Sequence, residues 1–286
     1  MICVCNISCC NNSIAKHFYI KTKSKIQYHT FVEVFDLHPN RAEEVFEKGK
    51  LLLQELKLLG LKGSLVPHAT YTVSQKLLKK ISEFSYEPEA ILCIHNQETS
   101  SENEMFRGRK GELFQFLNKA SLHFNEWKQT GFNALPSTLV HLPNCNKIGL
   151  VHNTYTVADD ITWAHLYSMQ IFWCLCPNAN LFIENRLPDI PVFIRNSCRI
   201  ILGTDSYASN WSLSILDEMK RIHTFFPEIN FQTMLAWATI RGAEFLGLHR
   251  SIGSFEKGKK PGVNLLEHVE MEKLQLTGET KVVKII

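Results

Sequence analysis

The sequence predicts an α/β fold in which the strands run parallel. Short runs of Val, Ile and Leu, typical of strands buried in a parallel sheet, alternate with longer segments of helical spacing. Four of these runs end on a histidine or an aspartate, and they cover residues 63–68, 90–95, 147–152 and 199–205. In a closed βα barrel the carboxyl ends of the strands meet at one rim, where active sites lie. The four endings therefore predict a cluster of His, His, His and Asp typical of a metal-dependent hydrolase.

In chain order, we expect seven strands and a helix in most of the connections. The clearest helix covers 39–59, where apolar residues recur at helical spacing and Gly60 ends the pattern. The segment 96–104 is expected to be a polar stretch, and the connection before the last strand a loop rich in Asn and Pro. The expected strands lie near residues 4, 30, 65, 92, 149, 173 and 201, and the other helices near 72–84, 113–124, 157–167, 213–225 and 231–246. A closed βα barrel has eight strands, one more than this pattern provides.

The pattern changes after Leu248. Residues 253–266 are rich in turn formers and strand-like, and residues 273–286 alternate apolar with polar side chains. Both segments are typical of a small β appendage. We therefore expect a barrel domain over 1–248 and a C-terminal β appendage over 249–286.

Composition limits the class of protein. A chain of 286 residues that is 45% hydrophobic and 21% charged is typical of one large domain, or of a domain with an appendage. A net charge of +3, with Lys and Arg spread along the chain, does not indicate a nucleic-acid partner. No apolar stretch reaches the roughly 18 residues of a membrane helix, and the N-terminus lacks the pattern of a signal peptide. We therefore expect a cytoplasmic protein without membrane or nucleic-acid partners.

The nine cysteines do not form a recognisable framework. Four of them lie in the first ten residues, and no paired CxxC elements exist, which excludes a zinc ribbon. Cys174 and Cys176 alternate along an expected strand, so both thiols should lie on one buried face. Reduced thiols in a cytoplasmic protein are the expected state.

His95 and Glu98 form an HxxE pair directly after an apolar run. At the end of a strand, the imidazole can bind a metal. The carboxylate three residues later can then carry a proton from a metal-bound water to a leaving group. The alternative is a loop histidine beside a surface glutamate, because so short a motif also occurs by chance.

Asp205, His152 and His68 also follow apolar runs. A carboxylate after a buried strand is costly unless it is paired or bound to metal, although Asp205 could instead cap the helix that follows. His152 could alternatively be a core or capping histidine. His68 could face a substrate or merely end its strand.

Taken together and in order, these residues resemble the amidohydrolase superfamily, which comprises metal-dependent hydrolases on a distorted TIM (β/α) barrel. The resemblance is strongest to its deaminases of adenosine, S-adenosylhomocysteine and aminofutalosine, with guanine and cytosine deaminases further away. It extends from about residue 1 to the end of the chain. The matching segments are 66–73, 95–98, 150–155, 203–210, 238–247 and 253–266.

The resemblance implies a role for each metal-site residue. His95 would ligate a single divalent metal, with zinc favoured over iron. Asp205 would touch the metal and accept a proton from its water. Glu98 would pass that proton to the substrate nitrogen, and His152 would orient or polarise the attacking water.

The resemblance also implies a small nucleoside-like substrate. His68 would contact its sugar or ring, and Ser206 would belong to the same substrate-binding group. The reaction would be attack of water on an amino-bearing ring carbon with release of ammonia. A homodimer is the expected assembly.

The sequence departs from the family at one point. The family's first strand normally carries an HxH pair that supplies two metal ligands, and this chain contains no HxH. Residues 2–7 align best with the family's second strand. The resemblance thus predicts a distorted TIM barrel missing its first strand, with a remnant of a small β-sandwich appendage. Because catalytic zinc usually has about three protein ligands, we expect the metal to be weakly bound or absent and the activity to be weak or lost.

Two other functions are compatible with the sequence. A catalytically dead nucleoside-binding or scaffold protein would bind nucleosides without turnover. A hydrolase that cleaves a halide or an amide on the same scaffold would differ only in its choice of leaving group.

Overall fold

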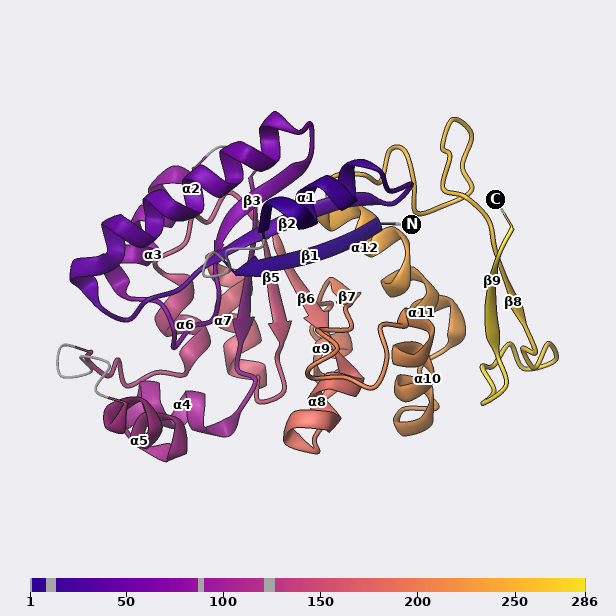
Figure 1. Ribbon diagram of the computed structural model, residues 1–286. Helices are drawn as coiled ribbons and strands as arrows, with labels where there is room; N and C mark the ends of the chain where they lie inside the picture. Colours follow the sequence, from indigo (N-terminus) through magenta and orange to yellow (C-terminus); the bar gives the residue numbers. More distant parts are fainter. Residues whose placement is uncertain (1, 9–13, 87–89, 121–126, 286) are drawn as a thin grey trace.

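All seven expected strands are present, and they form two parallel sheets (Figure 1). The computed structural model describes residues 2–8, 14–86, 90–120 and 127–285. The first sheet has the order β1 (Ile2–Ser8), β2 (Gln27–Val34) and β3 (Lys62–Pro67). The second has the order β4 (Ile91–Asn96), β5 (Lys147–His152), β6 (Ile171–Leu175) and β7 (Ile200–Leu202).

The two sheets join where β3 and β4 end. A parallel bridge pairs Ala69 with His95, and the backbone N–H of His95 donates to the carbonyl oxygen of His68 at 3.0 Å. Among the described residues, β1 is paired with β2 alone and β7 with β6 alone. The parallel α/β architecture is confirmed. Closure into a barrel and the missing first strand stay predictions.

Helices flank the strands along most of the chain. Helix α2 packs on β2 and β3, as Figure 1 shows, and α12 contacts β7. The helices are α1 (Ile14–Thr22), α2 (Ala42–Leu58), α3 (Gln75–Phe84), α4 (Ser100–Gly108), α5 (Gly111–Lys119), α6 (Ala134–Leu139), α7 (Ala158–Tyr167), α8 (Pro177–Glu184), α9 (Ile190–Arg195), α10 (Ile215–Phe225), α11 (Phe231–Ala238) and α12 (Ile240–Phe245).

Several expected boundaries are wrong. The helix expected over 39–59 begins as a short 3-10 turn, η1 (Pro39–Arg41), and the one expected over 231–246 is interrupted at Thr239. Part of the polar stretch 96–104 forms α4, and the loop rich in Asn and Pro contains α8 and α9. Helices α4 and α8 bury polar side chains such as Glu102, Asn103 and Asn180. Their inward faces therefore lack the apolar period that marks a helix in sequence.

One large hydrophobic core lies between the sheets and their helices. Its largest fully buried side chains include Trp173, Phe31, Phe172 and Phe193. A second, smaller cluster lies under α4 to α6 and is built around Met105 and Phe106. Ile94 and Val151, which precede His95 and His152 in β4 and β5, belong to the large cluster, so the strand ends that carry these histidines adjoin the core.

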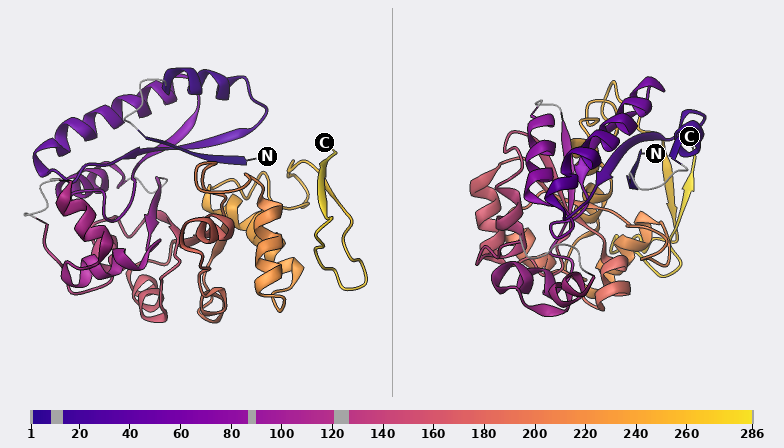
Figure 2. Two further views of the ribbon diagram at one scale, coloured as in Figure 1. Left: turned by 60° about the horizontal axis from the view of Figure 1, so that its bottom comes forward. Right: turned by 60° about the vertical axis from the view of Figure 1, so that its left-hand side comes forward.

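The last part of the chain forms an antiparallel hairpin. Strand β8 (Asn264–Glu267) pairs with β9 (Lys281–Lys284), and Figure 2 shows the hairpin beside α10 and α11. Nζ of Lys220 on α10 donates to the carbonyl oxygen of Gly278 at 2.9 Å. Both expected β segments thus contribute a strand, while the boundary between 1–248 and 249–286 stays a prediction. Within the described ranges, no helix has the length and apolar character needed to cross a membrane.

The close approach of β2 to β3 predicts that Gly63 tolerates no side chain. A Cβ at this position would lie 2.4 Å from the carbonyl oxygen of Thr30 on the neighbouring strand. We expect Gly63→Ala to lower the free energy of unfolding by about 1–3 kcal/mol, because the strands must separate. Urea denaturation followed by circular dichroism measures this change.

Gly242→Ala is the matched control for this substitution. A Cβ at Gly242 on α12 would meet no atom within 4 Å. The free energy of unfolding should therefore stay the same or rise by up to about 1 kcal/mol, since alanine is the better helix former. A Gly63→Ala protein as stable as the wild type would contradict the described packing of the two strands.

Candidate active site

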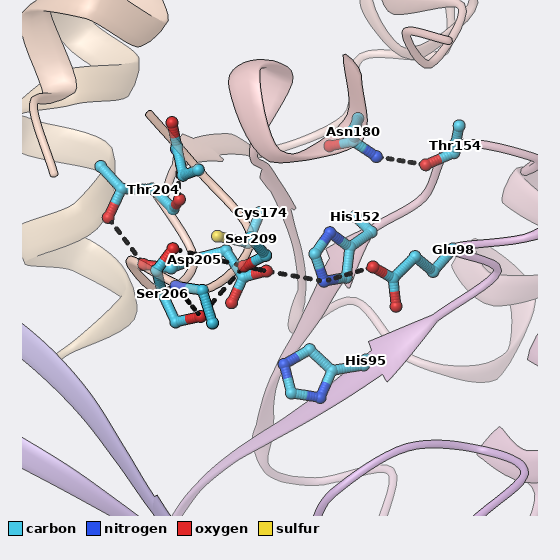
Figure 3. A network of polar contacts seen from close by, with 12 residues as sticks. His95, Glu98, His152, Thr154, Cys174, Asn180, Thr204, Asp205, Ser206 and Ser209 are labelled. Atoms are coloured by element: carbon cyan, nitrogen blue, oxygen red, sulfur yellow. Dashed lines mark hydrogen bonds and ion pairs between the residues drawn. The ribbon is translucent and has the colours of Figure 1, made fainter. Parts of the chain in front are cut away.

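The expected site residues come together at the carboxyl ends of the strands, as Figure 3 shows. His95 is the last residue but one of β4, His152 ends β5, and Asp205 follows β7. One ligand atom from each of these three residues lies within 4.8 Å of the others. The ring of His68 stands beside them, with its centroid 4.9 Å from that of His95. Three strand ends thus supply two imidazoles and one carboxylate to one point.

The chain turns sharply as it leaves two of these strands. His152, Asn153 and Asp205 have positive φ angles of 74°, 60° and 57°. Such angles are uncommon for residues other than glycine, so surrounding contacts must hold them. The side-chain amide of Asn153 provides one such contact, because it donates to the carbonyl oxygen of Leu150 at 2.7 Å.

His95 is held in one tautomer. Its Nδ1 lies 2.7 Å from the carbonyl oxygen of His68, which can only accept, so Nδ1 carries the hydrogen and donates it. The lone pair of Nε2 is then available to a metal, as in most histidine ligands. Burial lowers the pKa of His95 to about 4. The ring is therefore neutral at pH 7, the form that binds metals.

His152 occupies the centre of the cluster and is 1% exposed. Its Nε2 lies 3.6 Å from Oε1 of Glu98 and 4.0 Å from Oδ2 of Asp205. Burial lowers the pKa of His152, while Asp205 and the side chain of Asn180 partly offset this effect. The other nitrogen, Nδ1, is buried.

Glu98 is the group best suited to carry a proton. Burial raises its pKa to about 7, and the negative charges of Asp205 and Glu184 contribute to the rise. A carboxyl with a pKa near neutrality can both take up and release a proton at physiological pH. Figure 3 shows Glu98 and Asp205 on either side of the His152 ring.

Asp205 and Ser206 lie in one tight turn after β7. Oγ of Ser209 donates to Oδ2 of Asp205 at 2.6 Å. The helix that follows is capped by Ser214, so the interpretation of Asp205 as its N-cap is wrong. Ser206 is exposed, and its Oγ accepts from the N–H of Ala208 at 3.2 Å. Its contact with a substrate stays a prediction.

His68 is oriented by its own turn. Its Nδ1 lies 3.0 Å from Oγ1 of Thr72, and its ring meets that of His95 edge to face. Burial lowers the pKa of His68 to about 4, which leaves the ring neutral. The structure therefore places His68 next to the cluster, and its contact with a sugar or ring stays a prediction.

The donor set fits a divalent metal. Two neutral imidazoles and a carboxylate are the ligand types of a catalytic zinc site, which has three protein ligands and an open position. The hydrogen bond that fixes His95 is the outer contact such a ligand requires. His152 offers a third candidate ligand atom beside those of His95 and Asp205, the two ligands expected from sequence.

Sequence reasoning missed a buried carboxylate behind this site. Glu102 is fully buried, and its Oε1 accepts from the N–H of Gln97 at 2.8 Å and from Oγ1 of Thr70 at 2.5 Å. Its Oε2 accepts from the N–H of Glu98 at 3.0 Å. The signal was present, because Thr99 and Glu102 have the spacing of a capping box that starts a helix.

A second buried carboxylate supports the opposite side. Glu218 accepts from the N–H of Asn178 at 2.8 Å and from Nδ2 of Asn210 at 2.9 Å. The same amide of Asn210 donates to the carbonyl oxygen of Thr204, next to Asp205. No local pattern marked Glu218, because its partners follow other strands.

Known proteins resemble this chain in sequence and in fold. The aminodeoxyfutalosine deaminase of Deinococcus radiodurans is 27% identical over 227 residues, which cover 76% of this chain and 54% of that protein. Among solved structures, Helicobacter pylori aminofutalosine deaminase in complex with methylthio-coformycin has a TM-score of 0.73 at 20% identity, covering 88% of this chain and 61% of that one. An adenosine deaminase from Xanthomonas campestris with bound zinc has a TM-score of 0.65 at 20% identity, covering 89% and 55%.

The matches cover most of this chain but only part of each relative. The chain spans about half the length of the curated relatives it matches, from 40% to 54% of the first three. The structural likenesses show a shared fold. Residues 14–285 match the sequence description of the amidohydrolase family, nearly the whole chain. The chain therefore belongs to the amidohydrolase family.

Proposed function

We propose that this protein is a metal-dependent hydrolase of C–N bonds that deaminates a nucleoside-like substrate. The observation that carries the proposal is the meeting of His95, His152 and Asp205 within 4.8 Å, with the carboxyl of Glu98 beside them. The names of the similar proteins support a substrate of the aminofutalosine or adenosine type. Zinc is the metal proposed, supported by the zinc in the Xanthomonas structure.

Each site residue has a chemical task in this proposal. His95, His152 and Asp205 would hold the metal, and the chemistry that it would supply when bound is a lowered pKa of water toward neutrality. Asp205 would accept a proton from the water that attacks the amino-bearing ring carbon. Glu98 delivers a proton to the departing nitrogen, so that water and the amine become the oxo product and ammonia. His152 also faces the attacking water.

The proposal also extends to substrate contacts, cellular location and assembly. His68 stands beside His95 and is proposed to contact the sugar or ring, together with Ser206 in the turn after β7. A cytoplasmic location and a homodimer are also proposed. The absence of HxH from this sequence favours one alternative, a protein that binds nucleosides without turnover.

The metal site predicts a measurable stoichiometry. Purified protein dialysed against zinc should hold about one equivalent by elemental mass spectrometry, because three ligand atoms converge. His95→Ala should lose that metal. His141→Ala, which changes a histidine outside the cluster, should retain it. Metal-free wild-type protein, or His95→Ala protein that keeps its zinc, would contradict the site.

The role of Glu98 predicts a selective loss of rate. Glu98→Gln should reduce ammonia release from adenosine-type nucleosides by about 10²–10⁴-fold, because a positioned acid–base group contributes that much. Zinc content should stay unchanged, since Glu98 is not among the ligands. An enzyme-coupled assay of ammonia gives the rate.

Chloride release from a halogenated nucleoside analogue tests the halide-cleaving alternative.

An exposed glutamate provides the control. Glu83→Gln changes a residue on α3 whose Oε1 lies 3.9 Å from Nζ of Lys79, and it should leave the rate unchanged. Equal rates for Glu98→Gln and wild type would refute the acid–base role. Nucleoside binding without ammonia release by the wild type would favour the non-catalytic alternative.

A further inference from the structure

We propose that Glu102 is a positioning residue that holds Glu98 and the ends of β3 and β4 in the geometry of the site. The proposal rests on the proposed function insofar as Glu98 is the proton carrier. Glu102 lies in the first turn of α4, behind the site, and touches none of the candidate metal ligands through its carboxylate.

The carboxylate of Glu102 faces three donors. Two are the consecutive backbone N–H groups of Gln97 and Glu98, and the third is the hydroxyl of Thr70. In an ordinary capping box, the glutamate would reach back to the N–H of the cap residue itself. Here it reaches one and two residues further back, into the loop that carries Glu98.

This loop needs such support. Gln97 has a φ angle of 47°, which is unfavourable for a residue with a side chain. Its peptide planes set the direction in which the Glu98 side chain leaves the backbone. Because both N–H groups bond to one fixed carboxylate, Glu98 can keep its place beside His152 without substrate or metal.

The same carboxylate spans the junction of the two sheets. Thr70 follows the end of β3, and its backbone N–H donates to the carbonyl oxygen of His95 at 3.4 Å. Its hydroxyl donates to Glu102. Glu102 thereby links the segment after His68 to the segment after His95, where a single bridge joins the strands.

A carboxylate suits this position better than a neutral side chain. When ionised it offers only acceptors, whereas the amide of glutamine would present donor hydrogens to at least one of the three donors. A buried N–H that loses its acceptor is costly. Burial raises the pKa of Glu102 to about 7 and the three hydrogen bonds oppose that rise, so the donors offset part of the cost of burying the charge.

Glu218 provides a matched comparison in the same chain. It is also fully buried, burial raises its pKa to about 7, and its carboxylate also accepts from a backbone N–H, that of Asn178. Its contacts lie near Asp205 rather than near Glu98. Replacing either glutamate by glutamine removes one buried carboxylate, so general destabilisation should be similar.

Amide hydrogen exchange on the full chain tests the proposal directly. In Glu102→Gln, the N–H groups of Gln97 and Glu98 should exchange about tenfold faster or more, while that of Asn178 keeps its wild-type rate. In Glu218→Gln the pattern should be reversed. Exchange that rises equally at all three amides, or not at all at Gln97 and Glu98, would overturn the proposal.

A kinetic cycle adds a second readout. In metal-loaded protein, Glu102→Gln should lower kcat about tenfold with KM unchanged, and it should cause no further loss in a Glu98→Gln background. A loss of the same size in both backgrounds would contradict positioning. Absence of turnover in the wild type would refute the proposed function, while the exchange rates would still decide the role of Glu102.

Glu102→Asp covers the case in which Glu102→Gln does not fold. This variant keeps the charge but shortens the side chain by one methylene group, which withdraws the carboxylate from the Gln97 and Glu98 amides. The same two amides should exchange faster, with Asn178 unchanged. Wild-type exchange at both amides in Glu102→Asp would count against the proposal.

Discussion

The hydrogen bond from Nδ1 of His95 to the carbonyl oxygen of His68 is the contact on which the rest of the site depends. It lies at the junction where the two sheets meet, so it belongs to the fold as well as to the site. It also directs the Nε2 lone pair of His95 toward His152 and Asp205. The carbonyl oxygen of His68 thus accepts both the backbone hydrogen bond that joins the sheets and the side-chain hydrogen bond that sets the tautomer and ligand direction of His95.

The site is surrounded by buried polar groups that hold an unfavourable backbone. Gln97, His152 and Asp205 all have positive φ, and each lies at or just after the end of a strand. Glu102 and Glu218 secure the loops on two sides by accepting from main-chain and side-chain donors. The hydrogen bonds of these two glutamates thereby compensate for the unfavourable φ angles at the strand ends. Such compensation is common where function needs a side chain in a particular orientation.

Burial gives the histidines and the glutamates of this rim opposite electrostatic behaviour. It disfavours every charged form, so it lowers the pKa of His68 and His95 to about 4 and raises that of Glu98 to about 7. Neutral imidazoles can bind a cation, and a carboxyl that titrates near neutrality can exchange protons. Desolvation therefore gives the histidines the neutral form that binds a metal and gives Glu98 the pKa that suits proton transfer.

The sequence by itself determined the seven parallel strands and the residues His68, His95, His152 and Asp205 at their ends, because apolar runs and their terminal residues are local patterns. It did not reveal α4 and α8, whose buried faces carry polar side chains, or α9, which is only six residues long and buries Ile190 and Phe193. Only the tertiary structure placed His152 within ligand distance of His95 and Asp205, and only it showed that Glu102 and Glu218 support the loops. The physical reason is that a buried polar group is satisfied by partners far away in the chain, and no local period records which partners they are.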